Sequence, residues 1–486
     1  MIKLFFNKYR KVLVLLFSFA LLYSLISLTN HYNFRTYALD LGAYTNALYD
    51  YSHFHLNDST VFKETGENLL ADHFDLYLIL FSPFVFLFGT YTLLVMQILF
   101  VLFGGVGIYL YLKASDKPEF IALAATLFFF LFFGTFSALA FDYHSNVVAA
   151  SLLPWLFYTL KKEKWLATSL VILFIIVAKE NTSLWLAFIF IGFSARHWKE
   201  KPKRNFMLAS SVVCFVFFIL VTTAVMPALS NNGTYPHFHY SVLGSNFGEA
   251  FYHLIRHPLE SLEVLFTNHT AEPNSDYVKT EFHTLILLCG LPLLLRKPWF
   301  LLMLIPIYFQ KMFHDNPSMW GVFGHYNIEF APILAIGVFL CVSDIKNSRM
   351  LKISCIAVLA LELACTIRTF DSTVQFTNKA CLRFYQQCHY ERDYNVAAVH
   401  KHLSEIPSEA IVSAQSPFLP HLALRESIYQ FPIIRDAEYV VFSNREEMYP
   451  LKENEFQNLT DSLLHSDIWT PFIHTKELVI LKRNSN

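Results

Sequence analysis

The stretch Phe74–Gly89, FDLYLILFSPFVFLFG, decides how the rest of the chain is arranged. It is about as apolar as a membrane-spanning helix, but it contains Pro83 and runs almost directly into the next apolar segment, 91–112. A helix that crosses the hydrocarbon core needs about 20 mostly apolar residues. If 74–89 crosses the membrane, every later loop changes sides.

Charge decides between the two topologies. If 74–89 crosses, the basic loops 161–164 and 196–204 face outside; if it does not, both loops lie in the cytoplasm. In the second arrangement Lys and Arg concentrate in the inner loops and Asp and Glu in the outer loops, as the positive-inside rule requires. We therefore predict that 74–89 is a juxtamembrane or re-entrant helix on the outer side, covered by the bundle.

The composition indicates a multi-spanning membrane protein. Of the 486 residues, 55% are hydrophobic and only 15% are charged, whereas soluble chains carry roughly 25% charged residues. The net charge of −1 gives no attraction for nucleic acid. We predict an α-helical polytopic fold of about 11 spans. They are Val12–Leu28, 91–112, 120–141, 146–160, 165–178, 182–195, 206–228, 282–295, 299–313, 328–343 and 352–368.

These spans divide the chain into two predicted domains. Residues 1–368 form a transmembrane domain whose first outer loop covers about 29–90, and 369–486 form a small extracytoplasmic α/β domain. The N-terminus then lies in the cytoplasm and the C-terminus outside an inner or plasma membrane. In the tail we expect helices at 394–403 and 453–464, and strands at 410–414, 438–442 and 477–481.

Polar side chains gather at the outer ends of the predicted spans. They include Arg35, Asp40, Asp72, His73, Asp142, His144, Lys179, Glu180, Lys311, His325, Tyr326 and Glu329. Each one alone reads most simply as an interface residue, and Lys179 could pair with Glu180. Polar groups near lipid are costly, however, and mark candidate sites. The mixture of carboxylates, imidazoles and a lysine suits binding an anionic group and moving a proton.

Several segments carry a resemblance to a known family. They are DLGAYTNAL (40–48), ADHFDLYLILFSPFVFLFG (71–89), FDYHSNVVAASLLPW (141–155), VAKENTSLWL (177–186), GHYNIEFAPIL (324–334), VSAQSPFLPHLALRESIYQFP (412–432) and AEYVVFS (437–443). As a set they resemble the predicted membrane proteins called domain of unknown function 2079. That family looks like a branch of the GT-C glycosyltransferase superfamily, which includes protein O-mannosyltransferases and aminoarabinose transferases.

The resemblance implies an inverting glycosyltransferase that uses a polyprenyl-phosphate-linked sugar on the outer face of the membrane. Asp40 stands where these enzymes carry an essential acid in the first outer loop, and Asp142 where a second acidic motif follows the third span. We expect Asp40 as general base, with Asp142 and His144 completing the catalytic group. The expected substrate-binding residues are Arg35, His73, Lys179, Glu180, His325 and Tyr326.

The resemblance implies no certain cofactor. A divalent cation, if one binds, would be held by Asp40, Asp142 and His144. The expected partners are the lipid-linked sugar donor, membrane lipid, and an acceptor that is a glycan, a lipid or a protein, with no nucleic acid. Two alternatives stay open: a transporter or flippase of a lipid-linked glycan or anion, and a non-catalytic membrane scaffold with a GT-C-like fold.

Overall fold

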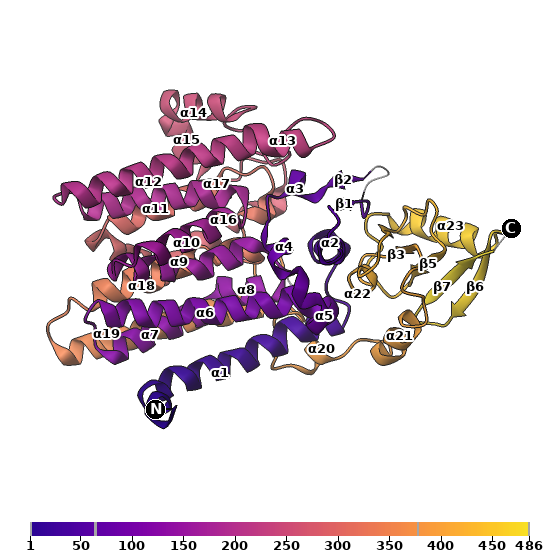
Figure 1. The fold of residues 1–486 in the computed structure, drawn as a ribbon, viewed down its shortest axis with the longest axis horizontal. Helices are drawn as coiled ribbons and strands as arrows, with labels where there is room; N and C mark the ends of the chain where they lie inside the picture. Colours follow the sequence, from indigo (N-terminus) through magenta and orange to yellow (C-terminus); the bar gives the residue numbers. More distant parts are fainter. Residues whose placement is uncertain (1, 63–65, 377–378, 485–486) are drawn as a thin grey trace.

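The computed structural model describes residues 2–62, 66–376 and 379–484. It consists of a helical bundle with a mixed sheet at one end (Figure 1). The predicted spans fall mainly on helices of this bundle. They are α1 (Ile2–Tyr32), α6 (Thr92–Ala114), α7 (Glu119–Leu131), α8 (Phe133–Ala140), α9 (Ser145–Lys161), α10 (Trp165–Ile176), α11 (Glu180–Arg196), α12 (Lys201–Leu220), α16 (Val278–Leu288), α17 (Trp299–Met312), α18 (Phe330–Val342) and α19 (Ser348–Asp371).

Several helices in the described part of the chain are long and apolar enough to cross a membrane. By length and composition there are five: Tyr9–Tyr32, Tyr77–Ala114, Lys201–Leu229, His325–Val342 and Ser348–Asp371. A sixth is the pair α7 and α8, which is bent by 42°. Helices α10 and α17 are apolar but shorter. The chain is therefore a largely helical protein with five or six candidate spans, and the number of about 11 stays a prediction.

The segment before α6 is broken into short turns. These are α4 (Tyr77–Phe81), η2 (Ser82–Phe84), α5 (Val85–Phe88) and η3 (Gly89–Tyr91). Pro83 cannot donate a helical hydrogen bond, and Gly89 takes a positive φ of 55°, which favours glycine. Helix α4 lies across the end of the bundle (Figure 1). Residues 77–91 also belong to the candidate span Tyr77–Ala114, so it stays a prediction that 74–89 turns back without crossing the membrane.

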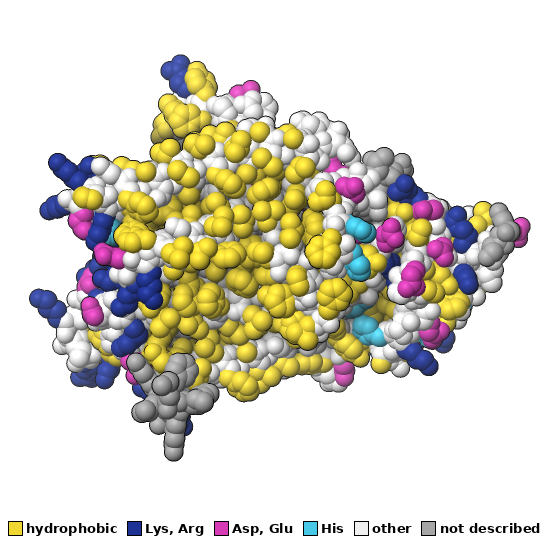
Figure 2. Space-filling model, in the orientation of Figure 1, with side chains coloured by type: hydrophobic (Ala, Val, Ile, Leu, Met, Phe, Trp, Pro, Cys, Tyr) yellow, Lys and Arg dark blue, Asp and Glu magenta, His cyan; other side chains and the backbone are white. Residues whose placement is uncertain are grey.

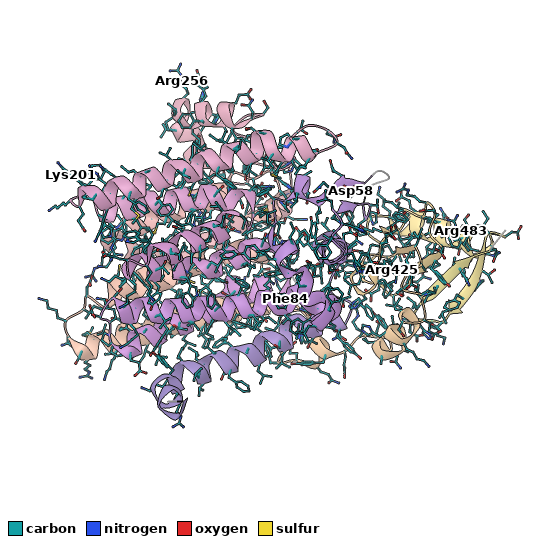
Figure 3. All side chains as sticks on the ribbon, viewed as in Figure 1. Asp58, Phe84, Lys201, Arg256, Arg425 and Arg483 are labelled. Carbon is teal, nitrogen blue, oxygen red and sulfur yellow. The ribbon has the colours of Figure 1, made fainter. Side chains whose placement is uncertain are left out.

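The two ends of the bundle differ in charge. Figure 2 shows an apolar face between an end rich in Lys and Arg and an end where Asp, Glu and His gather beside the sheet. Lys201, at the start of α12, lies at the basic end, and Arg483 lies at the far end of the sheet region (Figure 3). Helix α1 begins at the basic end and the chain finishes in the sheet region (Figure 1), so the two termini lie at opposite ends of the molecule.

The C-terminal region holds a five-stranded sheet of order β4-β3-β5-β7-β6. Strand β3 runs parallel to β4 and β5, whereas β7 is antiparallel to β5 and β6. The three predicted strands are confirmed as β3 (Val412–Ala414), β5 (Tyr439–Phe442) and β7 (Val479–Arg483), and the two helices as α21 (Val396–Leu403) and α23 (Glu453–Leu464). The sequence did not predict β4 (Ile428–Gln430) and β6 (Trp469–His474), because β4 is very short and β6 contains Pro471 beside a register shift.

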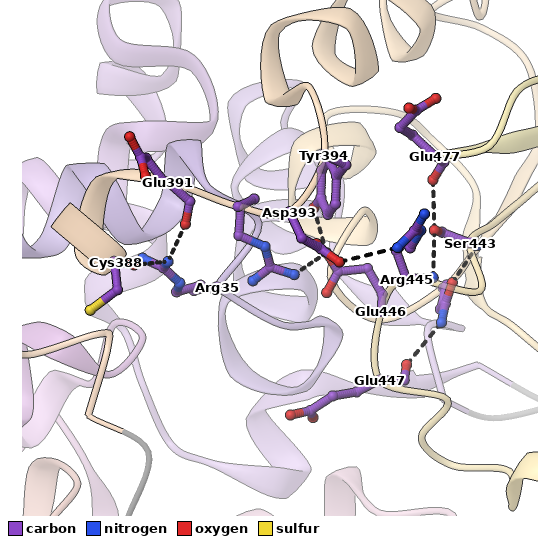
Figure 4. Close-up of polar contacts among 12 residues, drawn as sticks. Arg35, Cys388, Glu391, Asp393, Tyr394, Ser443, Arg445, Glu446, Glu447 and Glu477 are labelled. Atoms are coloured by element: carbon purple, nitrogen blue, oxygen red, sulfur yellow. Dashed lines mark hydrogen bonds and ion pairs between the residues drawn. The ribbon is translucent and has the colours of Figure 1, made fainter.

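The sheet region is fastened to the first outer loop. The Arg35 guanidinium donates hydrogen bonds of 2.6–3.0 Å to the carbonyl oxygens of Cys388, His389 and Glu391. Figure 4 shows those to Cys388 and Glu391. The backbone N–H of Gln430 donates to the carbonyl oxygen of Val61 at 2.8 Å. Charge-assisted hydrogen bonds of this kind are stronger than neutral ones, so the loop and the sheet region pack as neighbours at the acidic end of the bundle.

Candidate active site

Asp40 sits on a strained turn. Within η1 (Ala38–Gly42), Leu39 has φ −64° and ψ 137°, and Asp40 has φ 66° and ψ −92°. A non-glycine residue in such a region costs on the order of 1–3 kcal/mol and persists only where its surroundings hold it. Two partners hold it here. The N–H of Tyr37 donates to Oδ2 of Asp142 at 3.1 Å, and the N–H of Ala38 donates to Oγ of Ser416 at 3.1 Å.

The Asp142–His144 segment between α8 and α9 is held by a buried glutamine of α6. Oε1 of Gln97 accepts a hydrogen bond from the N–H of His144 at 2.9 Å, and its Nε2 donates to the carbonyl oxygen of Asp142 at 3.3 Å. The Asp142 carboxylate also accepts hydrogen bonds from the N–H groups of Tyr37 and Leu41. Asp142 therefore positions the turn that carries Asp40.

Asp40 and His144 face each other. Oδ2 of Asp40 lies 3.6 Å from Nε2 of His144, a nitrogen that is buried and has no hydrogen-bond partner among the described residues. The Tyr44 hydroxyl also hydrogen bonds to Asp40. His144 stacks on His325 with ring centroids 3.3 Å apart, and both ring nitrogens of His325 are likewise without a partner in that part of the chain.

Burial sets the protonation of this group. It raises the pKa of the Asp40 carboxyl to about 7, and the positive charge of Lys179 limits that rise. Burial also lowers the pKa of His144 well below its usual range, with Lys179 adding to the effect. The pKa of Asp142 is raised by burial and then by the negative charge of Asp40. Near neutral pH, Asp40 is thus poised to accept a proton beside a neutral imidazole.

Asp40 separates two small cavities. One, of about 190 Å³, lies between Asp40 and the sheet region and is lined by Tyr37, Leu39, Asp40, Phe141, Asp142, Ser416, Glu447 and Tyr449. The other, of about 120 Å³, is lined by Leu39, Asp40, Ala43, Tyr44, Ser59, Phe62, Glu67, Asn68, Leu69 and Asp72. The carboxylate can therefore meet a molecule held between the bundle and the C-terminal sheet region.

A third cavity, of about 90 Å³, surrounds Lys179. Its lining includes His73, Lys179, Glu180, Tyr235, His237, Tyr240, Lys311, Tyr326 and Glu329. Lys179 is only 7% exposed, yet its ammonium has no hydrogen bond or ion pair to any residue in the described ranges. The other lysine, Lys311, instead donates to the carbonyl oxygens of Met319 and Gly321. The carboxylates of Asp40, Asp72 and Glu180 act on this ammonium only at longer range, so Lys179 is suited to hold an anion directly.

Glu180 does not fix the Lys179 ammonium, as the pairing expected from the sequence would require. Its Oε1 lies 3.3 Å from Nδ1 of His73, and its Oε2 accepts from the N–H of Phe74 at 3.2 Å. The carboxylate points to the first outer loop because the helix α11 begins at Glu180, directly opposite His73–Phe74. Arg35 is also placed away from the three cavities, since its guanidinium is engaged by backbone carbonyls.

The structure places the expected metal ligands only partly in position. Asp40 and His144 offer an oxygen and a partnerless nitrogen 3.6 Å apart, whereas Asp142 is engaged by backbone N–H groups. Sequence reasoning missed Gln97, a fully buried glutamine inside the apolar helix α6 that could have been noticed for that reason. It also missed His237, Glu447 and Tyr449, which come from distant loops and carry no local pattern.

Residues 30–472 match the family described as "Predicted membrane protein (DUF2079)". The chain belongs to the DUF2079 family. No curated protein matches this DUF2079 chain. Among solved structures, it is similar to the crystal structure of the Archaeoglobus fulgidus oligosaccharyltransferase tethered with an acceptor peptide containing the NVT sequon via a disulfide bond. That similarity has a TM-score of 0.46 at 12% sequence identity, and it covers 90% of this chain and 69% of the archaeal one.

Proposed function

We propose that this protein is an inverting glycosyltransferase that moves a sugar from a polyprenyl phosphate to an acceptor on the outer face of the membrane. One observation carries the proposal. The carboxylate of Asp40, with its pKa raised to about 7, faces a cavity beside His144, and the partnerless ammonium of Lys179 lines the neighbouring cavity. A base and an anion-binding group near each other are what transfer from a phosphate requires.

The reaction follows from these positions. An acceptor hydroxyl in the cavity lined by Asp40 and Glu447 gives its proton to the Asp40 carboxylate, while its oxygen bonds to the anomeric carbon of the sugar. The bond between that carbon and the phosphate oxygen breaks, and the electron pair leaves with the polyprenyl phosphate. Lys179 holds the phosphate oxygens, and His73, Glu180, His325 and Tyr326 shape the donor side. Configuration at the anomeric carbon inverts because the two bonds lie on opposite faces.

A divalent cation is an optional cofactor in the proposal, because the proton transfer to Asp40 does not require it. Asp40 and His144 would hold it, with Asp142 as the third ligand after exchange of one backbone hydrogen bond. When bound, such an ion supplies positive charge to the leaving phosphate. The protein side chains carry out the proton transfer and the positioning. Asp40 accepts the proton, Tyr44 orients Asp40 by its hydrogen bond, and Gln97 fixes the segment that carries His144.

The proposed topology places this site outside the cytoplasm. Eleven crossings, with residues 1–368 as the transmembrane domain and 369–486 outside an inner or plasma membrane, put the basic ends of α9 to α12 in the cytoplasm. The separation of basic and acidic ends supports this orientation (Figure 2). The donor then reaches Lys179 from the lipid, and the acceptor, a glycan, lipid or protein, reaches Asp40 from the side of the sheet region.

Complementation with glycan analysis tests the proposal. Surface glycans, glycolipids and glycoproteins of a deletion strain are compared by mass spectrometry with those of strains that carry the wild type, Asp40→Asn or Asp58→Asn. Asp58 is an exposed acid of the same outer loop and serves as the matched control. We expect one sugar addition to be lost in the deletion and Asp40→Asn strains and restored by Asp58→Asn. Full restoration by Asp40→Asn, at wild-type protein level, would overturn the assignment of Asp40.

A further inference from the structure

A second cluster of ligand-type side chains lies apart from the Asp40–His144 pair. Asp72 ends the short helix α3 (Leu69–Asp72) and His73 follows it, whereas His237 comes from the loop before α14 (Phe247–Arg256). One ligand atom from each of the three lies within 4.8 Å of the others. We propose that Asp72, His73 and His237 bind a divalent transition-metal ion of the zinc class, which joins the first outer loop to the 230–246 loop.

The contacts of the two imidazoles indicate which nitrogen of each ring would bind the ion. Nδ1 of His73 lies 3.3 Å from the Glu180 carboxylate, and Nε2 of His237 lies 2.7 Å from the carbonyl oxygen of Asp72. His73 can donate its Nδ1–H to Glu180, which leaves Nε2 with a lone pair and without a partner among the described residues. Nε2 of His237 also lies 3.3 Å from Oδ1 of Asp72, so an ion bound there would replace the proton of this nitrogen and its contact with the carbonyl oxygen. His73 is therefore oriented as metal-binding histidines typically are, by a carboxylate on the opposite nitrogen.

The donor set selects the class of ion. Two imidazoles and one carboxylate are the ligands of many zinc sites, whereas Mg²⁺ and Ca²⁺ prefer oxygen donors only. The Asp72 side chain is 50% exposed and that of His237 28% exposed, so an ion can enter from the aqueous side. The carboxylates of Asp72 and Glu180 offset its charge beside the ammonium of Lys179.

The two loops are already in contact at this place. Oε1 of Glu67 accepts hydrogen bonds from Oγ of Ser230 at 3.0 Å and from the N–H of Asn231 at 2.8 Å. An ion on the neighbouring cluster would add a second link. Asp72 lines one of the cavities at Asp40, and His73 and His237 line the cavity of Lys179. The ion would therefore stiffen the wall between these two cavities, independently of whether the proposed transfer takes place.

Metal content of the purified full-length protein tests this site. The protein in detergent is stripped of metal and then given Zn²⁺ alone. We expect the wild type and His239→Ala to retain one tightly bound Zn²⁺ equivalent more than His237→Ala and Asp72→Ala do. Asp142→Asn, which removes a ligand of the other proposed cation site, should leave this equivalent in place. His239 is a histidine of the same loop outside the cluster and serves as the matched control. Glu180→Gln should weaken the affinity by about 10- to 100-fold, since it removes the group that orients His73.

Two further measurements distinguish loss of the metal site from misfolding of the variant. Zn²⁺ should raise the unfolding temperature of the wild type but not of His237→Ala, compared with the same protein without metal. His237→Cys loaded with Co²⁺ should show the sulfur-to-cobalt absorption band that the wild type lacks, which is a gain of signal. Retention of the Zn²⁺ equivalent by His237→Ala, or absence of that band in a folded His237→Cys protein, would overturn the proposal. Neither result bears on the activity of Asp40.

Discussion

Oδ2 of Asp40 lies 3.6 Å from Nε2 of His144, although the two residues come from separate segments, one in the first outer loop and the other after α8. The nitrogen has no other partner in the described part of the chain. Asp40 is the residue that we assign as the base. Among the described residues, Nε2 of His144 is the only imidazole nitrogen within 4 Å of its carboxylate.

If the pair acts as a unit, its two members should not contribute independently to the rate. We expect Asp40→Asn to lower kcat/KM by about 10²- to 10⁴-fold, the usual contribution of a general base. His144→Ala should lower kcat/KM less, and the double variant should be no slower than Asp40→Asn, because groups that act together are not additive. Steady-state kinetics of the four proteins measure this. Multiplicative losses in the double variant would argue for two separate roles.

The rate of transfer should depend on pH through Asp40. Its pKa is raised to about 7 by burial, and a general base works only when it is deprotonated. The transfer rate should therefore be low at pH 5 and rise to a plateau above about pH 8. The measurement is the pH profile of kcat/KM at constant ionic strength. A flat profile from pH 5 to 9 would exclude Asp40 as the group whose protonation limits the reaction.

The same carboxyl should make stability depend on pH. Because the pKa of Asp40 is raised in the folded protein, its neutral form is favoured there, and this contribution to stability is lost as pH rises from about 4 through about 7. Asp40→Asn should thus unfold at a higher temperature than the wild type at pH 8, and at nearly the same temperature at pH 5. An inactive variant that is also less stable at pH 8 would instead indicate a structural role.

Lys179 should be needed for the donor rather than for folding. Removing its charge with Lys179→Gln should reduce kcat/KM for the donor by about 100-fold or more, comparable with the loss of one oxyanion-binding group. Lys164→Gln, at the exposed N-cap of α10, is the matched control and should leave the rate unchanged. Binding of a polyprenyl phosphate without sugar should weaken in parallel with the rate. Unaltered binding by Lys179→Gln would remove Lys179 from the phosphate site.

Gly42 should be important for the contact between the Asp40 turn and the sheet region. A Cβ at this position would lie 2.5 Å from Cδ2 of Leu419, in α22 (Leu419–Leu422). We expect Gly42→Ala to lower the transfer rate by shifting the turn, and Leu419→Ala to restore much of it in the double variant because it removes the clash. Rates of the four proteins form the cycle. No recovery in the double variant would mean that the close approach is not the cause.

The sequence predicted much of the helical bundle but less of the site. Segments such as 91–112 and 352–368 are long and uniformly apolar, so their positions follow from composition, and α6 and α19 lie there. Asp40 and His144 could be named from a resemblance in their local motifs. Glu447 and His237 could not, because each reaches the site only through contacts between segments far apart in the chain. Such contacts depend on tertiary packing and leave no periodic signal.

Short segments are also hard to predict from the sequence. The strand β4 has three residues, too few for alternation to show, and it is fixed by pairing with β3 rather than by its own sequence. The strained Asp40 turn is similar, since it is held by Asp142 and Ser416 and not by local propensity. Sequence patterns predict elements whose own composition stabilises them. The site is built mainly from turns and short strands that are stabilised by tertiary contacts instead.

Ser416, Glu447 and Tyr449 form one wall of the cavity at Asp40. These residues are translated only after the whole bundle has been made. In a chain that is still being synthesised, Asp40 is therefore not yet enclosed by this cavity. The cavity forms only when residues 416–449 have folded against the first outer loop.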